Sequence, residues 1–190
     1  MFATKRTLSF FTGLALLLAG ATTQVAASSP QYELLKAVED QDIKKVTELL
    51  AKDVSPDTRR RSDRAPALLI AIDKANMALV KLLLDYDANP DIGDPERGET
   101  ALMRRAIAGD VNGVKLLLSY DADPNRADIG QETALMKAVR ARKYKVVSTL
   151  LEAGADPNVQ DFTGKTALEY AKLSRSRRMV RMLEDAGATY

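Results

Sequence analysis

The chain has 190 residues, of which 46% are hydrophobic, and it carries 28 basic and 26 acidic side chains. This size and balance suit one soluble domain. Cysteine, histidine and tryptophan are absent from the sequence. Disulfides, thiolate nucleophiles, zinc sites built from Cys and His, and Ser-His-Asp triads are therefore excluded.

The first 27 residues predict a secretory signal peptide. Lys5 and Arg6 precede a mostly apolar run over 8–21, which is shorter than the about 20 residues that a membrane-spanning helix needs. Small residues suit cleavage after Ala27, so we expect a periplasmic or secreted protein. Ala21 stands where a lipoprotein would need a cysteine, and no lipid anchor is expected.

Most of the excess of basic over acidic residues lies in this leader. Without Lys5 and Arg6, the remaining chain carries as many basic as acidic side chains. A neutral chain offers no general attraction for polyanions. We therefore expect no binding to nucleic acid, and none to a membrane after the leader is cleaved.

The rest of the chain is a repeat with a period of 33 residues. Thr-Ala-Leu begins at Thr100, Thr133 and Thr166, and Asp-Pro-Asn recurs at 123–125 and 156–158. A fixed period of this size is typical of stacked repeat arrays. With two less regular copies before Thr100, we expect a domain over 28–190 whose repeats span approximately 32–62, 63–95, 96–128, 129–161 and 162–190.

Each copy carries two short segments with helical periodicity. In the third copy they span 101–108 and 111–120, with Gly109 at the break. Apolar residues recur three and four positions apart, which predicts one apolar face on each helix. Helices this short are marginal alone, so stacked neighbours must bury these faces. Thr100 and its equivalents can cap the first helix of each copy, whereas Pro66 starts that helix in the second copy.

A turn and a polar stretch of about eight residues follow each second helix, which predicts a protruding hairpin-like loop. Gly154 and Gly187 stand directly after the second helix, where a left-handed backbone is usual. Asp53, Asp87 and Asp121 stand at that position in the first three copies. We expect these aspartates to be left-handed, at a cost on the order of 1 kcal/mol each relative to glycine.

The Thr-Ala-Leu motif, the Leu-Leu-Leu second helix and the Gly-Ala-Asp-Pro-Asn turn at this spacing resemble ankyrin repeats, over 32–190. The resemblance implies an all-α solenoid of about five stacked helix-turn-helix repeats with finger loops. The chain departs from the family pattern at Arg105, where alanine is usual. We expect the stem of Arg105 to lie along the core edge with its guanidinium in solvent.

Ankyrin repeats bind partner proteins through their finger loops and the concave inner face of their first helices. The resemblance therefore implies a non-catalytic scaffold that binds a protein partner, needs no cofactor and acts as a monomer. Apolar Ile107 lies on the inner face between charged neighbours and resembles a hot spot inside a polar rim, and Phe162 has no evident core role in its polar loop. The candidate partner-binding residues are Asp73, Lys74, Arg97, Glu99, Ile107, Ala108, Ile129, Arg140 and Phe162.

Three other charged features have structural interpretations. The acidic run over 121–132 has the spacing of a calcium-binding EF-hand loop, but Arg126 stands where that loop needs glycine, so no metal site is expected. Arginines cluster at 59–64 and at 175–181. The first cluster suits a solvated finger tip, although it could also grip a phosphate or an acidic partner. The second suits a polar cap on the terminal repeat.

The partner's identity stays open at this stage. Small bacterial ankyrin proteins are associated with support of an oxidative-defence enzyme such as a catalase. They are also associated with immunity, in which the protein covers the active site of a secreted toxin. A carboxylate-based hydrolase is the competing interpretation, and a deep pocket with converging acids would favour it. A structural or lipid-surface role is opposed by the neutral charge.

Overall fold

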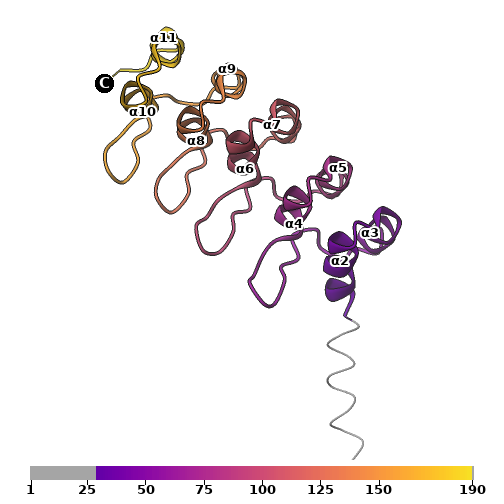
Figure 1. The fold of residues 1–190 in the computed structure, drawn as a ribbon. Coiled ribbons are helices and arrows are strands. Elements are labelled where there is room, and N and C mark those ends of the chain that lie inside the picture. The colour runs from indigo at the N-terminus through magenta and orange to yellow at the C-terminus, as the bar shows by residue number, and fades with distance from the viewer. Residues whose placement is uncertain (1–28, 190) are drawn as a thin grey trace, which may run out of the picture.

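The computed structural model describes residues 29–189, and the predicted signal peptide, 1–27, lies outside the described residues. The described chain is a stack of five helix pairs (Figure 1). The first helices of the pairs are α2 (Pro30–Glu39), α4 (Ala67–Asp73), α6 (Ala101–Ala108), α8 (Ala134–Arg140) and α10 (Ala167–Leu173). The second helices are α3 (Ile43–Leu50), α5 (Met77–Asp85), α7 (Val111–Leu118), α9 (Tyr144–Glu152) and α11 (Arg177–Asp185). The predicted all-α solenoid is confirmed.

The first and second helices form two rows, and four loops project from the row of first helices (Figure 1). We call these connections finger loops 1 to 4; they span 57–66, 91–100, 125–133 and 158–166. Single antiparallel bridges, Arg59 with Pro66 and Ala127 with Thr133, close the first and third loops. The hairpin-like loops expected from the sequence are therefore present. Among the described helices, none combines the length and the apolar character needed to cross a bilayer.

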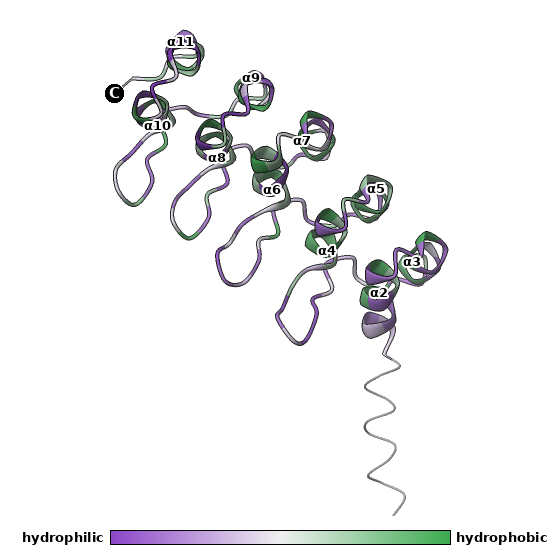
Figure 2. Ribbon diagram, viewed as in Figure 1, coloured by the Kyte–Doolittle hydropathy of each residue, from purple (hydrophilic) through white to green (hydrophobic). Residues whose placement is uncertain are grey.

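Apolar faces join the helices into one continuous core. In α6 and α7, the residues Leu102, Ala106, Val114 and Leu117 are buried, as the periodicity predicts. Figure 2 shows hydrophobic residues concentrated on the helices and hydrophilic residues along much of the finger loops. Because each helix has ten residues or fewer, this shared burial rather than intrinsic propensity stabilises the helices.

Helix ends follow the sequence expectation with one correction. The hydroxyls of Thr100, Thr133 and Thr166 each accept a hydrogen bond from the backbone N–H three residues later, which confirms the predicted caps. The second helix of the third repeat, expected over 111–120, ends at Leu118. The chain turns over the next residues because Asp121 is left-handed, with φ of 59°.

Left-handed residues recur at two further turns of each repeat. Asp53 and Asp87 have φ of 61° and 62°, which confirms the prediction for the turn after the second helix. The other positions are not evident from the sequence, because most of them are not glycine. Between the helices of a pair, the residues with positive φ are Gln41, Ala75, Gly109, Arg142 and Arg175. Repeat geometry therefore overrides local preference at these positions, at a cost on the order of 1 kcal/mol for each non-glycine residue.

The last residue of each Asp-Pro-Asn-like turn connects one repeat to the next. Side-chain oxygens of Asp57, Asp91, Asn125 and Asn158 accept hydrogen bonds from a backbone N–H in the following turn, over 2.9, 3.0, 2.7 and 2.7 Å. Stacked turns thus share a row of side-chain to backbone bonds. This row gives the recurring Asp or Asn a role between repeats as well as within its own turn.

Arg105 corrects the expectation that its guanidinium lies in solvent. The side chain is only 15% exposed, and Nη1 lies 3.7 Å from Oδ2 of Asp110. Its Nη2 donates a hydrogen bond of 3.2 Å to the carbonyl oxygen of Ile72. That carbonyl lies near the end of α4, where helix carbonyls lack partners within the helix. Arg105 therefore links the third repeat to the second.

Candidate functional site

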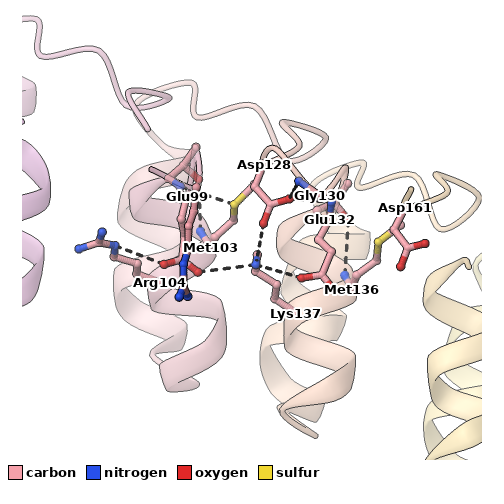
Figure 3. Close-up of polar contacts among 12 residues, drawn as sticks. Glu99, Met103, Arg104, Asp128, Gly130, Glu132, Met136, Lys137 and Asp161 are labelled. Atoms are coloured by element: carbon pink, nitrogen blue, oxygen red, sulfur yellow. Dashed lines mark hydrogen bonds and ion pairs between the residues drawn. The ribbon is translucent and has the colours of Figure 1, made fainter. Parts of the chain in front are cut away.

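A row of alternating charges runs along the bases of the finger loops. We call it the finger-base ladder. Its members come from the loops and from the first helices α4, α6 and α8 (Figure 3). They are Asp73, Asp94, Glu99, Arg104, Asp128, Glu132, Lys137 and Arg140.

Lys137 lies at the centre of the ladder. Its Nζ lies 2.8 Å from Oδ2 of Asp128, 3.1 Å from Oε2 of Glu132 and 3.7 Å from Oε1 of Glu99 (Figure 3). The lysine side chain is only 12% exposed. Burial lowers the pKa of Lys137, but its hydrogen bonds to Asp128 and Glu132 outweigh burial and raise the pKa overall. A charged lysine thus joins finger loops 2 and 3.

Arginines continue the ladder in both directions. Nη1 of Arg104 lies 2.6 and 2.7 Å from the two carboxylate oxygens of Asp73, and Nε of Arg104 lies 3.6 Å from Glu99. Toward the C-terminus, Arg140 donates a hydrogen bond to Glu132, and its guanidinium lies 5.3 Å from the centre of the Tyr170 ring. The ladder therefore connects repeats 2 to 5 through contacts within the protein.

An aspartate at the start of each of finger loops 2, 3 and 4 organises that loop. In loop 4, Oδ1 of Asp161 accepts hydrogen bonds from the backbone N–H groups of Thr163 and Lys165, over 2.7 and 3.0 Å, and Oδ2 accepts one from the Tyr170 hydroxyl. Asp94 and Asp128 accept equivalent backbone bonds in loops 2 and 3. Burial raises the pKa of Asp161, but these hydrogen bonds outweigh burial and lower it well below its usual range. Hydrogen bonds from backbone N–H groups to these aspartate side chains therefore hold the three loops.

Three predicted partner-binding residues belong to this ladder. Asp73, Glu99 and Arg140 are each within ion-pair distance of another residue of the chain. The sequence contains a signal for this arrangement, since Glu99 and Arg104 recur one period later as Glu132 and Lys137. Acidic and basic residues that repeat in register can pair between neighbouring repeats.

The apolar predicted residues are exposed. Ile107 on α6 is 41% exposed, Ile129 in finger loop 3 is 62% exposed, and Phe162 in finger loop 4 is 74% exposed. Backbone hydrogen bonds join neighbouring finger loops. The N–H of Ile129 in loop 3 donates to the carbonyl oxygen of Arg97 in loop 2 over 2.9 Å, and the N–H of Phe162 in loop 4 donates to the carbonyl oxygen of Gly130 in loop 3 over 3.1 Å. Ile129 and Phe162 therefore occupy equivalent positions on adjacent loops.

The remaining predicted residues are also accessible. Lys74 follows α4, Ala108 ends α6, and Arg97 lies in finger loop 2, and all three are exposed. Leu173 at the end of α10 occupies the position equivalent to Ile107 and is exposed as well. The finger loops and first helices thus present separate apolar side chains around the paired charges of the ladder.

The hollows of the surface do not favour acid–base catalysis. The hollow between finger loops 1 and 2, of about 330 Å³, is lined by Asp63, Asp73, Asp94, Glu96 and Glu99 together with three arginines. A hydrogen bond from Arg60 lowers the pKa of Asp63 to about 2, and backbone bonds outweigh burial to lower the pKa of Asp94. A general acid needs a raised pKa instead. Asp63 pairs with Arg60, and Asp73, Asp94 and Glu99 pair with Arg104, so these four carboxylates act as structural partners of the arginines.

Another hollow lies at the N-terminal end of the stack. It measures about 780 Å³, no carboxylate lines it, and its lining consists of Ser29, Gln31, Tyr32 and Leu35 with 58–62 of finger loop 1. Within the described residues, no group of three or more acidic side chains is arranged to hold a metal ion. The arginine cluster at 59–64 is partly used internally, since Arg60 pairs with Glu39 and Asp63.

Comparison with known proteins identifies one family. A family model described as ankyrin repeats (3 copies) matches residues 34–128, 68–161 and 127–190. No curated protein matches the chain.

Proposed function

The chain belongs to the ankyrin-repeat family, and from that membership we propose that it is an exported scaffold that binds one partner protein through its finger loops and first-helix face. Ankyrin repeats mediate protein–protein binding. Beyond family membership, the proposal specifies the binding surface, export from the cytoplasm, and a role in binding rather than catalysis. The four apolar side chains that this surface presents are Ile107, Ile129, Phe162 and Leu173.

The exposed pair Ile129 and Phe162 carries the proposal. Both side chains are more than half exposed, on adjacent loops whose backbones are bonded to each other. Burying such side chains against a partner yields roughly 25 cal/mol for each Å² of apolar surface removed from water. Because loops 3 and 4 are held by hydrogen bonds to Asp128 and Asp161 and by mutual backbone bonds, little ordering entropy is lost on binding.

A capture experiment tests the surface. The full chain, with a C-terminal affinity tag, is produced in its own cells, and the proteins that bind to it are identified. The double variant Ile107→Asp with Phe162→Ala should lose the captured partner while keeping the unfolding midpoint of the parent protein. If capture survives in the folded double variant, the finger loops and first-helix face are not the binding surface.

A matched control variant distinguishes specific binding at this surface from nonspecific hydrophobic binding. Ile43 lies on α3, a second helix outside the proposed surface, and its exposure of 42% matches the 41% of Ile107. Ile43→Asp should therefore retain the partner. Loss of capture in this variant as well as in the double variant would point to nonspecific hydrophobic binding.

Export rests on the sequence of the leader and has its own test. The mass of the protein purified from its own cells should correspond to a chain that starts at Ser28, with cleavage after Ala27. A mass that includes residues 1–27 would contradict export by a cleavable signal. The identity of the captured partner then distinguishes the cover of a toxin from the support of an oxidative-defence enzyme.

A further inference from the structure

The turns between the helices of the last two repeats carry a dense group of cations. We call this group the basic edge. The segments around it, 141–151 and 171–183, contain no acidic residue. Its members are Arg142, Lys143, Lys145, Arg175, Arg177 and Arg178.

Contacts between the two repeats hold this edge together. Nη2 of Arg142 donates a hydrogen bond of 2.6 Å to the carbonyl oxygen of Ser174, and the guanidinium of Arg178 lies 4.9 Å from the centre of the Tyr144 ring. The Tyr144 hydroxyl lies 3.0 Å from Oγ of Ser176. The two turns are thus fixed relative to each other, and their cations form one surface.

The contacts between the two turns do not neutralise the positive charge of the basic edge. None of the six cations of the basic edge lies within ion-pair distance of a carboxylate among the described residues. The nearest equivalent acid in the third repeat, Asp110, is already used: it lies 3.7 Å from Arg105 and accepts a hydrogen bond of 2.9 Å from the N–H of Gly113. The charge of the basic edge is therefore uncompensated within the described chain.

This arrangement works against stability. Lys143 precedes α9, and Arg177 and Arg178 begin α11, so positive side chains lie at the positive ends of two helices. Like charges crowded on one edge also repel each other. A polar cap on a terminal repeat needs hydrophilic side chains, but it does not need six cations without an acid among them.

The basic edge also contains a place for a side chain to enter. Lys143, Lys145 and Arg178 line a hollow of about 320 Å³, together with Gly109, Val111 and the ring of Tyr144. No carboxylate lines this hollow. A carboxylate entering it would have three cations around it and an apolar floor beneath it, where charge-assisted hydrogen bonds are strong.

We infer that the basic edge, Arg142–Lys145 with Arg175–Arg178, is a second binding surface that docks an acidic segment of a partner protein. Finger loops join the helices at one side of the stack, and these turns join the opposite helix ends, so the edge is separate from the finger tips. This surface supplies electrostatic steering and fixes orientation. It goes beyond binding through the finger loops, and its test does not depend on that binding.

Charges around the edge favour a protein segment over a long polyanion. Asp110 precedes the edge in the third repeat, while Glu152, Glu184 and Asp185 lie at the far ends of α9 and α11. A nucleic acid or an anionic bilayer extending past the two turns would approach these carboxylates. A short acidic segment can contact the six cations without approaching the carboxylates.

Binding of a labelled octaglutamate peptide to the full chain, followed by fluorescence anisotropy, tests the inference. The triple variant Lys143→Gln, Lys145→Gln and Arg178→Gln should weaken binding by about tenfold or more, since each exposed charge pair contributes modestly. Binding by the parent should fall as salt is raised. A control triple variant, Lys44→Gln, Lys115→Gln and Arg126→Gln, removes the same charge from exposed positions elsewhere and should change binding less than about twofold.

Two further probes complete the test. A short DNA duplex and phosphatidylglycerol vesicles are measured under the same conditions, and both should bind more weakly than the peptide at physiological salt. Equal losses in the two triple variants, or no binding of the peptide at low salt, would overturn the inference. Tighter binding of the duplex or of the vesicles would overturn it as well, because the edge would then recognise a polyanion or a membrane.

Discussion

The finger-base ladder and the basic edge are both rich in charge, yet the protein uses them in opposite ways. In the ladder, Lys137 contacts three carboxylates and Arg104 contacts Asp73, Asp94 and Glu99. On the basic edge, six cations have no carboxylate within ion-pair distance in the described chain. Both rows lie across successive repeats. Charge density alone therefore does not identify a binding surface.

The difference lies in what each row already contacts. The central charges of the ladder, on Glu99, Arg104, Asp128, Glu132 and Lys137, are largely buried between finger loops and first helices. An unpaired ion would be costly there. Cations of the basic edge are mostly exposed at turns, where water solvates them and a partner can reach them. The ladder therefore stabilises the stack, and the edge is free to bind.

The largest effect is expected at the centre of the ladder. Lys137→Met removes the one cation that pairs with buried Asp128 among the described residues, whereas Glu99 keeps Arg104 and Glu132 keeps Arg140. The free energy of unfolding should fall by about 3 kcal/mol, as for removal of one partner from a buried ion pair. Urea denaturation of the parent and the variant measures the change. Lys115→Met, at an exposed position, is the control, and an equal loss in both variants would contradict a structural role for the ladder.

Acidification should weaken the finger loops next. Because hydrogen bonds lower the pKa of Asp161 and of Asp94 in the folded protein, their contribution to stability is complete above the unfolded pKa of about 4. It is lost as pH falls through the lower folded value. Asp161→Asn should cost about 2 kcal/mol at neutral pH, since it removes charged hydrogen bonds to Thr163, Lys165 and Tyr170.

The same variant checks the sign of the pH effect. The stability difference between the parent and Asp161→Asn should shrink as pH falls below about 5. In that range the carboxylate is protonated in the unfolded chain, near its usual pKa of about 4, while it stays ionised in the folded protein down to a lower pH. Thermal unfolding at several pH values measures this difference. A difference that is constant over the range would show that ionised Asp161 does not organise finger loop 4.

A smaller change in stability, of opposite sign, is expected at Asp121, which belongs to neither the ladder nor the basic edge. Asp121 has φ of 59° at the turn after α7, so Asp121→Gly should raise the melting temperature, with a gain on the order of 1 kcal/mol. Gly154 has φ of 85° in the equivalent turn, and an added Cβ would meet no atom within 4 Å. Gly154→Asp should therefore lower stability by a similar amount through backbone strain alone.

The two variants Asp121→Gly and Gly154→Asp test whether left-handed backbone strain, rather than charge, determines stability at these turns. If Asp121→Gly lowers the melting temperature, the turn does not have the expected geometry. If Gly154→Asp is neutral, left-handed strain does not limit stability at these turns. Either outcome would weaken the distinction between charges that form contacts and charges that merely occupy a position.

The smallest effect is expected at the exposed finger tips. Phe162 is 74% exposed, so Phe162→Ala should change the free energy of unfolding by less than about 0.5 kcal/mol. Chemical denaturation measures this change, and the buried control Leu102→Ala should cost about 2 kcal/mol or more. A large loss at Phe162 would mean that it packs against the protein rather than being available to a partner.

The sequence predicted the regular parts of the fold from features that repeat. The Thr100 cap, the apolar faces of α6 and α7, and the left-handed Asp53, Asp87 and Asp121 are all local to one repeat and recur. The end of α7 was placed two residues too late because Tyr120 and its neighbours do not break the apolar pattern. The backbone preference of arginine also does not predict that Arg142 and Arg175 are left-handed.

Contacts between repeats were harder to predict. Arg105 was expected in solvent because its acceptor, the carbonyl of Ile72, belongs to another repeat. Asp73, Glu99 and Arg140 were predicted as partner contacts because a single repeat does not show their ion pairs. Conversely, the cations at 175–181 were assigned to a terminal cap, and only the stacked turns bring Arg178 next to Lys143 and Lys145.

One measurement tests the distinction between the two rows most directly. The free energy of unfolding in urea is compared for two double variants that each remove two positive charges: Arg104→Gln with Lys137→Gln in the ladder, and Arg175→Gln with Arg177→Gln on the basic edge. The ladder variant should lose about 3 kcal/mol or more, whereas the edge variant should stay within about 0.5 kcal/mol of the parent or gain stability. Equal losses in the two variants, or a larger loss in the edge variant, would contradict the account.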